Sequence, residues 1–228
     1  MSTAIVSYDG TLNDQDALGL AGVLAGAGLE LVLSYVRHST VSQQSREELE
    51  EHEAEELLER GARWLGDLDV ERRVVVHAST GEGLRQLAEQ TDADLIVFGS
   101  DYRTPAGHVV PQASAQRLLE GGHTSLAIAP AGYAAVREHR IHALGLLADL
   151  DDHAAIDTAH ALAGHYNATV AGEGHGVDLL IVGSRREAAA GQVLVSARAQ
   201  NAIEQATCPV LVVARGVPVR FRSSLYVS

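Results

Sequence analysis

The sequence contains no lysine: its 17 basic residues are all arginines, and 30 aspartates and glutamates give a formal net charge of −13. An acidic surface repels phosphate backbones, and aromatic residues, on which nucleobases stack, make up only 4% of the chain. The composition therefore argues against a nucleic-acid partner. A single cysteine, Cys208, excludes an internal disulfide framework and a cysteine-rich zinc site.

Long apolar runs and a targeting segment are missing as well. No run reaches the roughly 18 residues that a membrane span needs, and Met1–Ala4 shows neither a basic region nor a cleavage site. We therefore expect a cytoplasmic protein without a membrane partner. Since 46% of the 228 residues are hydrophobic, a chain of this length can bury about 70% of its unfolded surface without a disulfide or a metal.

Short apolar runs alternate with helical patterns from Met1 to Pro130. The runs predict strands at Ala4–Tyr8, Leu29–Val36, Val74–Val76, Leu95–Phe98 and Leu126–Ala129. The patterns between them predict helices at Asp14–Ala25, Ser45–Leu65, Thr80–Thr91 and Ala113–Glu120. Because the strands are apolar throughout rather than at alternate positions, they favour a parallel sheet with helices on both faces.

The second half of the chain repeats the first, and we call the two repeats the first and the second unit. Asp94-Leu-Ile-Val-Phe-Gly99 matches Asp178-Leu-Leu-Ile-Val-Gly183, and the last strands match at the same interval without a gap. The first strand of the second unit, Ile141–Ala148, follows its counterpart at a much longer interval, so the second unit is the shorter one. We expect it to lack the long acidic helix, the third strand and the next helix.

The shortening raises a problem of connection. Ala168–Ala171 has the composition of a strand, but only residues 172–176 separate it from the next apolar run. Two parallel strands are normally joined by a crossover of a dozen or more residues. We therefore expect Ala168–Ala171 to be a connector or to pair antiparallel, which leaves the second unit with about three parallel strands.

A strand ending in Asp9, a strand ending in Gly99-Ser100 and the closing segment Thr207-Cys-Pro-Val-Leu-Val-Val213 resemble the universal stress protein family, over about residues 3–130 and 140–214. The resemblance implies an α/β fold, an open parallel sheet of order 3-2-1-4-5 with helices on both faces, like that of adenine nucleotide α-hydrolase-like and Rossmann-like proteins. It implies a complete domain at 1–130, a linker at 131–140, a truncated domain at 141–214 and a C-terminal tail at 215–228.

ATP-binding members of that family hold the nucleotide at the strand carboxyl ends, with a Gly-x2-Gly-x9-Gly-Ser/Thr motif. The motif positions are Gly99, Tyr102, Gln112 and Ala113 in the first unit, and Gly183, Arg186, Ser196 and Ala197 in the second. Only the first glycine of each survives. Losing two or three hydrogen bonds to phosphate, at about 1.5–3 kcal/mol each, would turn a micromolar site into a millimolar one, unless other donors such as Ser100, Arg185 or Arg186 compensate.

The resemblance assigns nucleotide-binding positions to Asp9, Val36, Gly99, Ser100, Asp149 and Gly183. Each has a structural explanation too, because aspartate commonly ends a strand before a turn, valine fills cores and glycine reverses the chain. Asp149, Asp151 and Asp152 could hold a metal, but aspartates at a helix start usually act as caps. We expect no metal and no firmly bound cofactor, with ATP or AMP as the alternative.

Catalytic motifs are missing: the sequence has no Walker A loop, no nucleophile elbow and no GxGxxG after a strand. We expect a regulatory stress-response protein that is not an enzyme, with degenerate nucleotide motifs and an unknown protein partner. Two alternatives stay open, an ATP- or AMP-binding stress protein with an altered loop at Ser100–Gln112, and a hydrolase of a related nucleotide-fold family. Backbone amides of that loop converging on an empty pocket would favour nucleotide binding.

The two units should also meet in a defined way. In the family, the fifth strands of two units pair antiparallel across a two-fold axis. We expect Leu126–Ala129 and Val210–Val213 to pair so within this chain, as an intramolecular pseudo-dimer, because an exposed apolar edge strand is an aggregation hazard. A linker of about ten residues, which can span roughly 30 Å, allows this. A homodimer through the same strands is the alternative.

Overall fold

The computed structural model describes residues 2–38, 44–66, 69–136, 138–172 and 176–222. The first unit contains β1 (Thr3–Ser7), α1 (Leu12–Gly26), β2 (Glu30–Arg37), α2 (Gln44–Leu65), β3 (Glu71–Val76), α3 (Thr80–Thr91), β4 (Leu95–Gly99), α4 (Ala113–Leu119) and β5 (Ser125–Ala129). A 3-10 turn, η1 (Tyr133–Ala135), leads to β6 (Ala143–Leu147), α5 (His153–Tyr166), β7 (Thr169–Gly172), β8 (Leu179–Gly183), α6 (Ala197–Gln205) and β9 (Val210–Val213).

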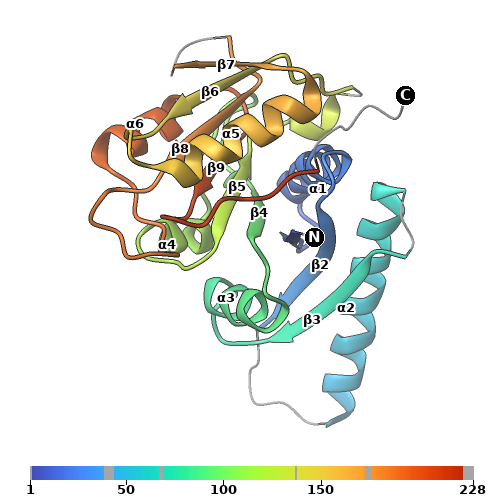
Figure 1. Ribbon diagram of the computed structural model, residues 1–228. Coiled ribbons are helices and arrows are strands. Elements are labelled where there is room, and N and C mark those ends of the chain that lie inside the picture. The colour runs from blue at the N-terminus through green and yellow to red at the C-terminus, as the bar shows by residue number, and fades with distance from the viewer. Residues whose placement is uncertain (1, 39–43, 67–68, 137, 173–175, 223–228) are drawn as a thin grey trace.

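The strands form one nine-stranded sheet of order β3-β2-β1-β4-β5-β9-β8-β6-β7 (Figure 1). Its first five strands have the predicted 3-2-1-4-5 order and run parallel. The two units join where β5 pairs antiparallel with β9, with Leu126 opposite Val212 and Ile128 opposite Val210. The predicted pairing of the two last strands within one chain is confirmed.

Helices cover both faces of this sheet, and each layer extends over both units. Leu18 of α1, Leu58 of α2 and Leu162 of α5 lie in one hydrophobic core cluster. The other cluster, on the opposite face, contains residues of α3, α4 and α6. Successive strand side chains alternate between the clusters, as Val97 and Phe98 do on β4. Both faces are thus buried, which explains why the strands are apolar at every position.

The expectation for Ala168–Ala171 was wrong, since β7 pairs parallel with β6 and gives the second unit four strands, β7-β6-β8-β9. β7 and β8 lie on opposite sides of β6, and Val170 and Leu179 are both level with Leu144. Gly172, the last residue of β7, is level with Leu146 of β6, and β8 begins level with Leu144. To connect β7 to β8, the chain therefore moves back by only about two residues, roughly 7 Å along the strand direction, and crosses one strand. A four-residue strand makes this return short enough to need no helix.

The second unit is shortened where predicted, because the described residues between β7 and β8 contain no equivalents of α2, β3 and α3. When Asp149 is aligned with Asp9, Gly145 occupies the position that Ile5 holds in the first unit. A Cβ atom on Gly145 would lie 3.1 Å from Leu180 Cδ1 and 3.2 Å from Val177 Cγ2. These two side chains fold over the glycine, which covers part of the sheet that α3 covers in the first unit.

The repeated aspartates before β4 and β8 have the same function in both units. Asp94 Oδ2 accepts a hydrogen bond from Thr3 N at 3.1 Å, and Asp178 Oδ2 accepts one from Ala143 N at 2.9 Å. Each carboxylate therefore fixes the start of the unit's first strand beside its neighbour.

The domain limits at residues 130, 140 and 214 stay an interpretation of the repeat. No helix in the described ranges is long and apolar enough to cross a membrane.

The continuous sheet predicts that the two units unfold together. Val212→Ala removes buried methyl groups at the β5–β9 pair and should lower the free energy of unfolding by about 2 kcal/mol. Trp64, the single tryptophan, lies in the first unit and Val212 in the second, so Trp64 fluorescence and circular dichroism should show one coincident, shifted denaturation transition. Val76→Ala, at a 50% exposed position, is the control and should change stability little. An unshifted Trp64 transition would mean that the units unfold separately.

Candidate functional site

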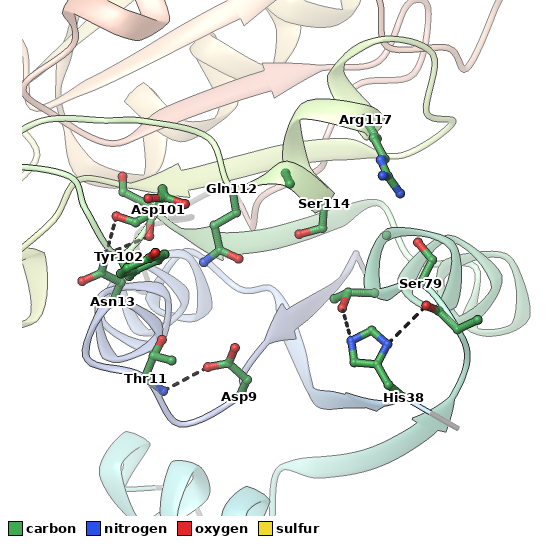
Figure 2. Close-up of a pocket in the computed structure, with 15 residues that line it drawn as sticks. Asp9, Thr11, Asn13, His38, Ser79, Asp101, Tyr102, Gln112, Ser114 and Arg117 are labelled. Atoms are coloured by element: carbon green, nitrogen blue, oxygen red, sulfur yellow. Dashed lines mark hydrogen bonds between the residues drawn. The ribbon is translucent and has the colours of Figure 1, made fainter. Parts of the chain in front are cut away.

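A cavity of about 420 Å³ opens at the carboxyl ends of β1, β2 and β4, where open parallel sheets place their ligands (Figure 2). Five segments supply its lining. They are the β1–α1 turn with Asp9, Thr11 and Asn13, the end of β2 with His38, the start of α3 at residues 78–81, the loop at Ser100–Tyr102, and the start of α4 with Gln112–Ser114 and Arg117.

Only some of the residues predicted from the sequence line this cavity. Asp9 and Ser100 line this cavity, and Gly99 precedes Ser100 in the chain. Val36 is not among the lining residues: it is 6% exposed and its Cγ1 would lie 3.1 Å from a Cβ on Gly83 of α3, which places it in the core. Asp149 and Gly183 line a separate cavity of about 450 Å³ in the second unit.

The two surviving motif glycines are needed for packing. A Cβ on Gly99 would lie 1.9 Å from the backbone oxygen of Asn13 in α1. A Cβ on Gly183 would lie 2.2 Å from Asp152 Oδ2, at the start of α5. Since real Cβ atoms do not come this close to other atoms, the approach of the helix explains both glycines without any phosphate.

The hydroxyl of Ser100 is also engaged by the fold. Ser100 is fully buried and its Oγ donates to Ala129 O, the last carbonyl of β5, at 2.7 Å. Ser184, its counterpart in the repeat, donates to Val213 O of β9, also at 2.7 Å. Both hydroxyls thus tie the end of a fourth strand to the end of a fifth, and neither is available to cap a phosphate.

The loop after β4 folds into a hairpin in which six backbone amides have hydrogen-bond partners. Ser100 and Pro111 form an antiparallel bridge. The donors are Asp101 N to Val110 O, Arg103 N to Asp101 Oδ1, Thr104 N to Asp101 O, Gly107 N to Ala131 O, His108 N to Pro105 O and Val110 N to Ser100 Oγ. These amides therefore do not converge on the cavity.

The second unit repeats this hairpin at the same interval. Arg185 N donates to Leu194 O and Gly191 N to Arg215 O, which are the counterparts of Asp101 N to Val110 O and Gly107 N to Ala131 O. The repeat is thus present in the hydrogen bonds as well as in the residues, although the loop side chains differ. The hairpin conformation is a shared property of both units.

Asn13 fastens the first hairpin to α1 and was missed in the sequence. Its Nδ2 donates to Ser100 O at 2.9 Å and to Asp101 O at 2.7 Å. The bonded residues are 87 and 88 positions apart in the sequence, and no local sequence pattern predicts a hydrogen bond over such a distance. Because both donors of the Asn13 amide are used, this residue too has little to offer a phosphate.

His38 was also missed, although its place directly after β2 could have indicated it. Figure 2 shows the ring between two parts of the α3 start, with Nδ1 3.3 Å from Ala78 O and Nε2 3.2 Å from Thr80 Oγ1. The first contact requires a proton on Nδ1, so Nε2 accepts from the threonine hydroxyl. Arg117 lies across the cavity and is exposed.

Two carboxyl groups meet in the β1–α1 turn. Asp14 is 3% exposed and its Oδ2 accepts from Asp9 N at 2.6 Å. Burial, then the hydrogen bond and the negative charge of Asp9, raise the pKa of Asp14 to about 8. Burial acts to raise the pKa of Asp9 as well, but hydrogen bonds from Asp14 and Thr11 outweigh it and hold this pKa below its usual value. The pair therefore carries one proton at neutral pH, on Asp14.

Arginines that line the second cavity form ion pairs at its edge. Asp151 Oδ2 lies 3.2 Å from Arg186 Nε and 3.2 Å from Arg215 Nη2, and Arg185 pairs with Glu187. The arginines considered as substitute phosphate donors thus have carboxylate partners. Asp152 caps α5 by accepting from Ala155 N, as expected for aspartates at a helix start. Among the described residues, no group of three metal-ligating side chains could hold an ion.

The buried serines give a matched pair of substitutions. Ser100→Ala and Ser184→Ala each leave a buried carbonyl without its hydroxyl donor, so each should lower the free energy of unfolding by about 1–2 kcal/mol. Ser114→Ala, at a half-exposed lining position, should have almost no effect. Chemical denaturation of the three variants measures this. Equal stability of Ser100→Ala and Ser114→Ala would show that the bond to Ala129 O contributes nothing.

The Asp9–Asp14 pair predicts a pH dependence of stability. The pKa of Asp14 is about 8 in the folded chain and near 4 in an unfolded one, so folding is progressively disfavoured as the pH rises from 4 to 8. The asparagine of Asp14→Asn cannot ionise but can still donate to Asp9 and accept from its amide. The variant should therefore gain Tm over the wild type between pH 4 and 8. Asp157→Asn, at an exposed position of α5, controls for lost charge, and a Tm difference independent of pH contradicts the assignment.

Comparisons with known proteins agree on the kind of fold. A universal stress protein from Archaeoglobus fulgidus DSM 4304 is similar over 94% of this chain and 98% of its own, with a TM-score of 0.70 at 14% identity. A functionally unknown protein from Pseudomonas aeruginosa PAO1 is similar over 93% and 92%, with a TM-score of 0.62 at 13% identity. A universal stress protein in complex with cAMP aligns over 42% of this chain and 75% of its own at 24% identity, but its TM-score is only 0.35.

The sequence comparisons point the same way. No curated protein matches the chain. The family model for universal stress proteins matches residues 1–130 and 171–214, so that the linker, β6 and α5 lie outside the match. Since these residues make up well over half of the sequence, the chain belongs to the universal stress protein family.

Proposed function

We propose that this protein is a regulatory, non-enzymatic universal stress protein whose two ligand cavities do not hold ATP in the manner of the family. The observation that carries the proposal is the hairpin at Ser100–Gln112, in which six backbone amides bond within the loop or to Ala131. A phosphate bound at the end of β4 would find these six amides already engaged, and the motif side chains at 102, 112 and 113 are Tyr, Gln and Ala.

Charge in the first cavity points in the same direction. Asp9 and Asp101 line it, and the lowered pKa of Asp9 keeps that carboxylate ionised at neutral pH. A triphosphate would face this negative charge with the exposed Arg117 as its cationic partner. Attraction by one exposed cation is weak, because water and salt screen it.

The second cavity supports the proposal independently. The described part of its unit has no equivalent of α3, whose start lines the first cavity, and the lining comes from the residues after β6 and β8 and the start of α6. Arg186 stands where the motif has its second glycine and pairs with Asp151. The positive charge of Arg186 is thus partly offset by a carboxylate. A protein with two such cavities is suited to act through its surface, on a protein partner.

Thermal denaturation with nucleotides tests the proposal. ATP at about 100 μM should leave the Tm of the wild-type chain unchanged, because ligand stabilisation follows RT ln(1 + [L]/Kd) and a millimolar site contributes under about 0.1 kcal/mol. Adenosine and AMP serve as ligand controls. A rise of several degrees with ATP alone would overturn the proposal, as would a nucleotide that remains bound through native purification and is seen by mass spectrometry.

A restored motif separates the two causes of weak binding. Tyr102→Gly, Gln112→Gly and Ala113→Ser together return the first unit to the family pattern. If the side chains alone exclude ATP, this variant should bind it at least about tenfold more tightly than the wild type by calorimetry. If the engaged amides of the hairpin exclude it, the restored variant should bind as poorly as the wild type. The corresponding changes at Arg186, Ser196 and Ala197 provide the second-unit control.

A further inference from the structure

The segment Arg215–Arg222 follows β9 and lies beyond the residues that the family model matches, which end at 214. It forms neither helix nor strand and crosses the face of the sheet that carries α1 and α5, where Figure 1 shows it in red running from β9 toward α1. Val219 and Phe221 are 1% and 8% exposed and belong to the core cluster shared by both units. Two apolar side chains, two residues apart, thus anchor this C-terminal segment.

The backbone of residues 219–222 makes hydrogen bonds as well. Val219 N donates to Thr158 Oγ1 of α5 at 3.0 Å, and Arg220 N donates to Ser2 Oγ at 3.3 Å. Arg222 N donates to Ala27 O at 2.9 Å, and Arg222 O lies 3.1 Å from His165 Nδ1. The partners come from both units. This is how proteins bind extended peptides, with main-chain hydrogen bonds for affinity and apolar positions for specificity.

We propose that Ser2, Ala27, Thr158 and His165 form a peptide-binding site for an extended segment with apolar side chains two residues apart. The chain's own C-terminal segment occupies this site as a displaceable ligand, and the same segment of another molecule of this protein can take its place.

The way the segment is tethered supports displacement. Gly216 has a φ of +72°, Val217 is 42% exposed, and Val217 N donates back to Ala214 O, so a turn separates the anchored residues from β9. Release breaks the contacts of Val219–Arg222 and leaves every strand pairing intact. Segments held by few buried side chains open at lower free energy than the sheet.

Charge favours this occupant over an acidic one. The segment contains three arginines, Arg215, Arg220 and Arg222, and no acidic residue, on a chain with a net charge of −13. A basic apolar peptide is therefore attracted to the body of the protein, and a peptide with carboxylates at positions 220 and 222 should be repelled.

A labelled peptide with the sequence of residues 215–222 tests the proposal on the full-length chain. In Phe221→Ala the chain's own segment loses its largest anchor, so this variant should bind the peptide, whereas the wild type should bind it at least about tenfold more weakly because its tethered segment competes. Arg220→Ala, at an exposed position, should behave as the wild type. A peptide carrying alanine at position 221 should bind neither chain. A folded Phe221→Ala chain that binds no peptide overturns the proposal.

Hydrogen exchange on the unmodified chain gives a measurement that needs no variant. The amides of Val219 and Arg222 should exchange at least about tenfold faster than those of Leu126 and Ala127 on β5, because the segment opens without the sheet. Equal exchange rates would mean that the segment leaves only when the whole chain unfolds. That result overturns displacement even if Phe221→Ala fails to fold.

Discussion

The antiparallel pairing of β5 with β9 is the interaction on which the rest of the structure depends. Leu126 and Val212 face each other there with no exposed surface, in the middle of a nine-stranded sheet. Without this pair each unit would end in an apolar edge strand, and the second unit would be a four-stranded sheet with only α5 and α6 to cover it. The pairing lets a truncated unit persist, because the truncation affects the far side of the sheet. It also occupies the edge through which family members pair, so another molecule has no free fifth strand to meet.

The same strands explain the structural roles of Gly99, Ser100 and their counterparts in the second unit. Ser100 and Ser184 hold the ends of β4 and β8 to the ends of β5 and β9, and each hairpin is tied to the segment that leaves the fifth strand. Because Gly99 and Gly183 have no Cβ atom, the starts of α1 and α5 can pack directly against them. The glycine and the serine at the end of each of these strands are therefore residues that the sheet itself requires.

Much of the fold could be predicted from the sequence because its signals are local or repeated. Uninterrupted apolar runs indicated buried parallel strands, and the interval from Ser100 to Ser184 identified the two units. The pairing of the fifth strands was predicted from the family resemblance. β7 was predicted wrongly because the crossover rule assumes strands of ordinary length, whereas Thr169–Gly172 is short enough for a direct return. Asn13 and Asp14 could not be found, since their effect comes from contacts or burial that no spacing encodes. The sequence also left open where the Ser100 hydroxyl points, and this decides between a phosphate ligand and a structural tie.

Two sets of packing contacts stabilise the second unit, which lacks some of the helices of the first. Val177 and Leu180 fold over Gly145 where a helix would otherwise lie. On the opposite face, Tyr166 of α5 hydrogen-bonds Val23 O of α1, and Val219 and Phe221 fill the core between these helices. The first set lies within the second unit, where β6 and β8 pair, and the second set joins segments of the two units beside the β5–β9 pair. The truncated unit thus contributes β9, which covers the edge of the first unit at β5.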